Sequence, residues 1–216
     1  MLTGKSTRTR ILDAAEQLMR GIGLARATTK EIARAAGCSE AALYKHFSSK
    51  EELFVQVLKE RLPRLNPLLD ELNSAPARRP GECGPGGAED PEARPVRENL
   101  LEVVRQAALF YESSVPIAAS LYAEPRLKER HYKAVAEMGA GPETPVRSLA
   151  DYLRRERGAG RLRPDADPEA AASLLLGACA QRAFVSDFAR TTGKEEQGLE
   201  EFAVSLVDTV LGGIGG

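Results

Sequence analysis

The stretch that decides the fold covers residues 28–50 and reads TTKEIARAAGCSEAALYKHFSSK. Ala33 is small where two helices would have to cross closely, and Gly37 can take the left-handed conformation that ends the first helix. Ser39 is a good N-cap for a second helix, which Leu43 would anchor in the core. The spacing of these residues predicts a helix-turn-helix.

The second predicted helix has two chemically different faces. Leu43 and Phe47, at positions i and i+4, would point into the core, whereas Tyr44 and Lys45 would point outward. A DNA-recognition helix needs small residues beside the base edges and hydrogen-bond donors beside the phosphates. The division between the two faces therefore indicates a helix that meets DNA.

The segment around this motif closely resembles the N-terminal DNA-binding domain of the TetR/AcrR transcriptional regulators. The shared pattern is Thr-x-x-x-Ile-Ala-x-x-Ala-Gly-Val-Ser-…-Leu-Tyr-x-His-Phe-x-x-Lys-x-x-Leu, and the resemblance covers about residues 8–60. Cys38 stands where Val is usual, as a small substitute that should still pack there. A second similarity joins GRLRPDADPEAAASLLLGA, residues 160–178, to the loop and penultimate helix of the family's C-terminal domain.

The resemblance implies which residues contact DNA. Four are implied to engage the DNA backbone: Thr29, Tyr44, His46 and Lys50. Five are implied to approach bases or adjacent phosphates: Ser39, Glu40, Ala41, Ala42 and Lys45. The expected surface also includes Thr28 and Lys30.

Three of these residues keep an alternative interpretation. Tyr44 could be a half-exposed helix aromatic, and the ring of His46 could pack only against the next helix. Glu40 can accept a hydrogen bond from cytosine N4, but phosphate otherwise repels it. Outside the motif, His131 lies in a charged stretch and is expected at the surface.

The rest of the chain reads as helical. Apolar residues recur at helical spacing and no stretch alternates with period two for long, which predicts an all-α protein. Further helices are expected at residues 9–21, 50–62, 66–72, 96–113, 126–138, 144–158, 167–190 and 199–214. Pro63 and Pro67 interrupt the helix that normally joins the two domains of the family, so a break or kink is expected near residue 62.

The expected organisation is two helical domains. Residues 1–50, extended to about 62 by the start of a connecting helix, would form a three-helix DNA-binding domain. Residues 51–216 would form a ligand-binding and dimerisation domain, with a flexible loop at 74–95 because that segment is rich in Pro, Gly and Ala.

Composition and charge agree with a DNA-binding protein. The 216 residues carry a net charge of −1, but the first 50 hold nine Lys and Arg against four Asp and Glu. A basic front on an acidic body favours a polyanionic partner. The three cysteines form no C-x-x-C pair, so neither a metal site nor a disulfide framework is expected. With no dinucleotide motif or phosphate loop, no cofactor is expected either. With no signal peptide and no run of 18 apolar residues, a cytoplasmic protein without a membrane partner is expected.

Two sets of apolar residues in the C-terminal part are candidates for further sites. Aromatic and sulfur side chains could line a cavity for a mostly apolar ligand: Phe110, Tyr111, Tyr122, Met138, Tyr152 and Phe184. For each of them, ordinary core packing is the alternative. The last two helices could pair with their two-fold mates in a four-helix bundle through Leu175, Leu176, Phe202, Leu206 and Val210.

The favoured hypothesis is a homodimeric repressor that a small-molecule effector releases from a palindromic DNA operator. The alternative is a DNA-bound helix-turn-helix protein that regulates a process other than transcription. An all-helical enzyme has the least support, because the sequence offers no nucleophile–base pair, metal-ligand cluster or dinucleotide motif.

Overall fold

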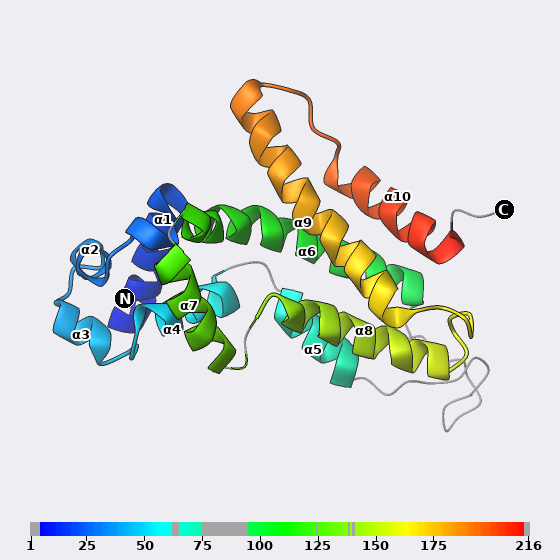
Figure 1. The fold of residues 1–216 in the computed structure, drawn as a ribbon, viewed down its shortest axis with the longest axis horizontal. Helices are drawn as coiled ribbons and strands as arrows, with labels where there is room; N and C mark the ends of the chain where they lie inside the picture. The colour runs from blue at the N-terminus through cyan, green and yellow to red at the C-terminus, as the bar shows by residue number, and fades with distance from the viewer. Residues whose placement is uncertain are drawn as a thin grey trace. The chain divides into compact units, whose positions relative to one another are not determined.

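The structure is a computed structural model that describes residues 5–61, 65–74, 95–123, 125–137, 139 and 141–213. Every regular element in these ranges is a helix (Figure 1), which confirms the predicted all-α class. None of the helices in the described part of the chain is long and apolar enough to cross a membrane.

The chain divides into two compact units. The first contains Met1–Leu62 and Ser113–Gly141, and the second contains Pro63–Glu112 and Pro142–Gly216. The division expected from the sequence was linear, whereas in the structure a later segment returns to the first unit. It returns because Ile117 and Leu121 are buried in the same core as the helix-turn-helix residues.

The first unit is built from α1 (Thr7–Arg26), α2 (Thr29–Ala35), α3 (Glu40–Tyr44), α4 (Lys50–Glu60), the end of α6 (Val96–Ala119), the 3₁₀ helix η1 (Ser120–Ala123) and α7 (Pro125–Glu137). Helix α1 packs against α2, α4 and η1, and α7 packs against α4 and η1. The shared core is apolar and includes Ile11, Leu12, Met19, Ile32, Leu43, Phe47, Leu53 and Val57.

Local hydrogen bonds fix where the short helices begin. At the start of α2, Thr28 Oγ1 accepts from the Glu31 amide at 3.2 Å, and the Glu31 carboxylate accepts from the Thr28 amide at 3.1 Å. This reciprocal capping box satisfies two amides that a helix start leaves unpaired. At the start of α4, Ser49 Oγ accepts from the Glu52 amide at 3.0 Å. Both helices are thus specified by their own first residues.

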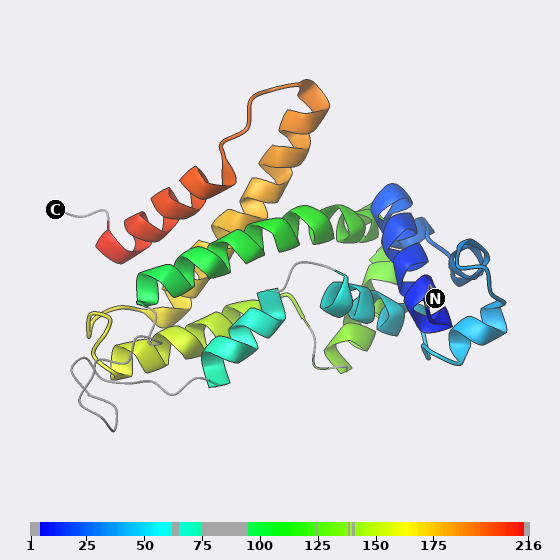
Figure 2. The ribbon, with the colours of Figure 1, turned by 180° about the vertical axis from the view of Figure 1, so that it is seen from behind.

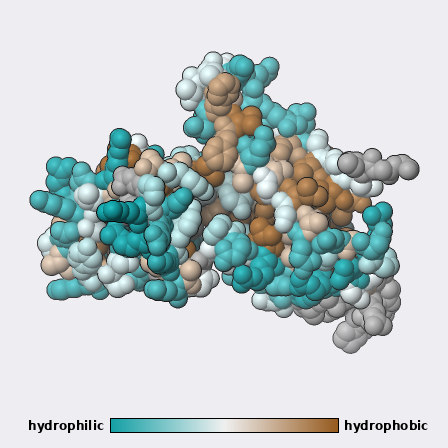
Figure 3. Space-filling model, in the orientation of Figure 1, coloured by the Kyte–Doolittle hydropathy of each residue, from teal (hydrophilic) through white to brown (hydrophobic). Residues whose placement is uncertain are grey.

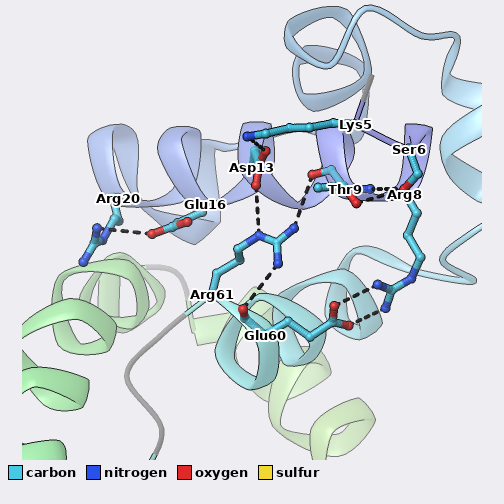
Figure 4. A network of polar contacts seen from close by, with 9 residues as sticks. All are labelled: Lys5, Ser6, Arg8, Thr9, Asp13, Glu16, Arg20, Glu60 and Arg61. Carbon is cyan, nitrogen blue, oxygen red and sulfur yellow. Dashed lines mark hydrogen bonds and ion pairs between the residues drawn. The ribbon is translucent and has the colours of Figure 1, made fainter. Parts of the chain in front are cut away.

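Ion pairs join α1 to the end of α4 (Figure 4). Asp13 accepts from Lys5 Nζ at 2.7 Å and from Arg61 Nε at 2.9 Å. These contacts, that of Lys5 first, hold the pKa of Asp13 below its ordinary value of 3.8. Arg8 donates through both terminal nitrogens to the Glu60 carboxylate. The start of α1 and the end of α4 are therefore held together by ion pairs as well as by the apolar core.

The second unit contains α5 (Leu65–Ser74), most of α6, α8 (Glu143–Gly158), α9 (Pro168–Thr192) and α10 (Leu199–Gly212). Helix α8 packs against α5 and α9, and α10 lies beside α9 (Figure 2). Asp167 caps α9 by accepting from the Ala170 amide at 3.0 Å, and Gly193, with φ of +68°, ends the helix in the left-handed conformation.

Some sequence-based expectations lie outside the described residues. These are the break at Pro63, the ligand candidate Met138, and the predicted loop at 74–95 apart from its two ends. Of those ends, Ser74 is the last residue of α5, and Pro95 directly precedes α6.

The expectation that His131 is a surface residue is wrong. Its side chain is only 4% exposed, and its ring lies 5.0 Å from that of Phe54. The charged residues around it on α7 suggested a solvated face, but this helix turns His131 toward α4. Burial, the dominant cause, lowers the pKa of His131 from its ordinary value of 6.5, and Lys50 acts in the same direction against Glu51.

This burial predicts an acid-sensitive first unit. Below about pH 6.5 the unfolded chain binds a proton at His131 that the folded chain resists, so the free energy of unfolding should fall as the pH is lowered. The loss should approach about 1.4 kcal/mol per pH unit until the folded-state pKa is reached. His131→Phe keeps a ring against Phe54 and should remove this part of the slope. Urea unfolding between pH 8 and pH 5 measures it, and an unchanged slope in the variant would refute the assignment.

Candidate nucleic-acid interface

The turn between α2 and α3 has the geometry that its residues predict. Gly37 has a φ of +65°, in the left-handed region that favours glycine. Ser39 Oγ accepts from the Ala42 amide at 3.1 Å and so caps α3. Leu43 and Phe47 are buried in the core of the first unit. The other face of α3 is consequently turned away from that core.

Most of the proposed DNA-contacting residues are exposed on α2, α3 and the turn after α3. The exposed ones are Thr28, Lys30, Ser39, Glu40, Ala41, Tyr44, Lys45 and His46. Tyr44 keeps 49% of its surface exposed, which is high for an aromatic side chain. Thr29, Ala42 and Lys50 are partly buried. This exposure leaves Tyr44 accessible to DNA and is equally that of the alternative, a half-exposed helix aromatic.

Polar contacts between α2 and α3 arrange the exposed face. Thr29 Oγ1 donates to Glu40 Oε1 at 2.5 Å and lies 3.4 Å from the Tyr44 hydroxyl oxygen. Lys50 Nζ donates to the Ala25 carbonyl oxygen at 3.3 Å. The carboxylate of Glu40, whose charge opposes phosphate binding, is thus already held by a hydroxyl of the neighbouring helix.

An open depression of about 480 Å³ lies beside this face. Its lining is Thr28, Thr29, Tyr44, Ser48, Ser49, Lys50, Glu51 and Arg130. Four of these residues were proposed from the sequence. Arg130 was not, because it lies on α7, far along the chain from the motif; the cluster of basic residues on α7 was the signal that could have drawn attention to it.

The candidate ligand residues have different environments. In the second unit Phe110 is buried, and burial raises the pKa of both Tyr111 and Tyr152 to about 12. Tyr152 accepts from Asn99 Nδ2 at 3.0 Å, so its hydroxyl belongs to the packed interior. Tyr122, in the first unit, and Phe184 are exposed. Those two rings do not line an enclosed space within their own units.

The candidate dimer residues also differ in their burial. Leu175 and Leu176 are buried within the second unit and are therefore unavailable to a second copy. On α10 the three candidates are half-buried, and the Arg182 guanidinium lies 5.0 Å from the centre of the Phe202 ring. The apolar side chains that α9 exposes are instead Leu174, Phe184, Val185 and Phe188. The helical spacing identified apolar residues on α9 and α10. It could not tell which of them are buried within the chain and which remain exposed.

Two family models match the chain. Residues 11–57 match the model of bacterial regulatory proteins of the tetR family, and residues 114–212 match that of the C-terminal domain of AefR-like transcriptional repressors. Together they cover most of the sequence. The chain belongs to the TetR family of bacterial regulatory proteins.

Individual relatives agree in part. The nucleoid occlusion factor SlmA of Marinomonas sp. (strain MWYL1) is 40% identical over 75 residues, which are 33% of this chain and 38% of that protein. The chain thus spans about 38% of the length of such curated relatives.

Two solved structures share the fold over nearly the whole chain. The regulator FadR of Bacillus subtilis, in complex with stearoyl-CoA, aligns with a TM-score of 0.60 at 16% identity and covers 95% of this chain and 98% of its own. SmeT, the repressor of a Stenotrophomonas maltophilia efflux pump, aligns in its triclosan complex with a TM-score of 0.60 at 22% identity and covers 96% and 91%.

Proposed function

We propose that this protein is a sequence-specific DNA-binding repressor that acts as a homodimer on a palindromic operator in the cytoplasm. The observation that carries the proposal is α3, which buries Leu43 and exposes Tyr44 and Lys45 next to the Lys50 depression. This arrangement suits a recognition helix in the major groove, flanked by side chains that donate hydrogen bonds to the DNA phosphates.

The proposed contacts follow from the position of each group. Tyr44 and Lys50 line the depression and would bind backbone phosphates. Ala41 and Ala42 leave room for α3 to approach the base edges, and Lys45 adds a donor. Glu40 would accept from cytosine N4 once the bases reach it, in exchange for its bond with Thr29.

The match to the C-terminal domain of AefR-like transcriptional repressors supports this proposal over the alternative function. The alternative, regulation of a process other than transcription, would correspond to SlmA, a nucleoid occlusion factor, but the similarity to that relative covers only 33% of this chain. It therefore supports a shared DNA-binding segment and does not favour a shared role.

The DNA-binding part is tested by selecting operators from a random duplex library with the purified protein. The selected site should be a near-palindrome whose half-sites lie about 34–36 Å apart. Tyr44→Ala and Lys50→Ala should each weaken binding roughly five- to 100-fold in fluorescence anisotropy, because a contact to DNA is lost. Arg163→Ala removes an exposed charge of the second unit and serves as the control. If both test variants bind with wild-type affinity, this face of the first unit does not contact DNA.

We assign the dimer contact to the exposed apolar residues of α9 and the half-buried apolar residues of α10. Leu174, Phe184 and Phe188 lie within an arc of about 80° around α9, since at about 100° per residue Phe188 is about 40° from each of the other two. A hydrophobic band over these two helices is visible in Figure 3. Water contact over such a band is unfavourable, and a two-fold mate would cover it with the same residues.

The dimer prediction is tested by placing a carboxylate in the proposed apolar interface. Leu174→Glu and Phe188→Glu should convert a dimer into monomers in size-exclusion chromatography with light scattering, because a buried unpaired carboxylate is costly. Arg163→Glu changes an exposed charge in the loop between α8 and α9 and should leave the dimer intact. A dimer that persists in both test variants would place the interface elsewhere.

Release by a small apolar ligand is the third part of the proposal. Two proteins of the same fold support it, since FadR was solved with stearoyl-CoA and SmeT with triclosan. In the second unit, Tyr111 combines an aromatic ring with a hydroxyl that has no hydrogen-bond partner among the described residues. Such a group suits a mostly apolar ligand with one polar atom.

The ligand prediction concerns operator complexes titrated with triclosan and stearoyl-CoA as probes. A compound that binds should lower the affinity for the operator, because a ligand can shift only a state that it prefers. Tyr111→Phe should raise the concentration needed for release several-fold while leaving DNA affinity without ligand unchanged. If compounds bind the protein and operator affinity stays the same, the protein is not ligand-released.

A further inference from the structure

We propose that the DNA surface extends beyond the helix-turn-helix onto α7, where Arg130 provides a second phosphate contact. The ligand is the phosphodiester backbone just outside the region that α3 covers. This inference rests on the proposed DNA binding by α3, and it adds a site on a segment that follows the motif by some 80 residues.

Arg130 lies beside the residues that would already bind phosphate. It lines the same depression as Thr29, Tyr44 and Lys50, and all of them belong to the first unit. Its neighbour His131 is buried against Phe54 of α4. That contact fixes the turn of α7 from which Arg130 projects, so the backbone of Arg130 is held beside the depression.

The chemistry of Arg130 suits phosphate. Its side chain is 72% exposed and its Nε lies 3.7 Å from Glu51 Oε1, a distance too long for a strong hydrogen bond. Among the described residues no acceptor is within hydrogen-bonding distance of its two terminal nitrogens. A guanidinium offers parallel N–H donors that match two phosphate oxygens.

The two lysines of α7 have different neighbours. Lys133 pairs with Glu129 at 2.8 Å, and Lys128 lies 5.3 Å from the centre of the Tyr122 ring. Neither of these lysines lines the depression. Arg130 is therefore distinguished from them by its position and not by its charge.

Glu51 gives Arg130 a second effect that must be separated from direct contact. Its carboxylate also lines the depression and would repel phosphate. The Arg130 guanidinium compensates that charge, so removing Arg130 would weaken DNA binding even without a direct contact. Replacing Glu51 by Gln removes this indirect effect and leaves the direct one.

The experiment measures affinity for the selected operator by fluorescence anisotropy between 50 and 200 mM KCl. Arg130→Ala should weaken binding roughly two- to ten-fold and reduce the slope of log affinity against log salt by about 1, without changing which bases are preferred. The loss should persist when Arg130→Ala is made in the Glu51→Gln background. Lys133→Ala, the matched control on the same helix, should bind like the wild type.

Each other result contradicts the inference in a recognisable way. If Arg130→Ala behaves like Lys133→Ala, α7 does not contact DNA, although the proposed function stands. If Glu51→Gln restores full binding to Arg130→Ala, Arg130 only masks a carboxylate. Urea unfolding of Arg130→Ala must match the wild type, because a lower stability would assign the loss to folding. A wild-type protein that selects no operator would overturn the proposed function and this inference together.

Discussion

The burial of Leu43 and Phe47 is the constraint on which the proposed interface depends. Helix α3 has five residues, too few to be stable by itself in water. Its direction is set by these two side chains in the core of the first unit and by the cap of Ser39. The exposed face of α3 is thus oriented by the core beneath it, as a surface that distinguishes base sequences requires.

Charge reinforces this anchoring at one particular place. The Arg8 guanidinium lies 5.4 Å from the centre of the Phe47 ring and also pairs with Glu60 at the end of α4. One side chain of α1 therefore touches both the anchor of the recognition helix and the helix that follows it. Asp13, bound to Lys5 and Arg61, adds a second link between the same helices (Figure 4).

Sequence reasoning succeeded where the determinants are local. The cap at Ser39, the left-handed Gly37 and the inward Leu43 each follow from residues within one turn of the feature they create. It failed where the determinant lies far along the chain. His131 is buried because α7 packs on α4, and Leu175 is buried because α9 has partners on that side. Arg130 could not be connected with Tyr44 for the same reason, since only the folded chain brings them to one depression.

The return of the chain to the first unit has a consequence for recombination between family members. Ile117 and Leu121 belong to the same apolar core as Ile11 and Leu43, although residues 63–112 separate the two segments of this unit. A crossover placed after residue 62 would join a helix-turn-helix from one parent to core residues from another. Chimeras that exchange DNA specificity must therefore exchange two separate stretches of the gene, or else supply matching side chains at both.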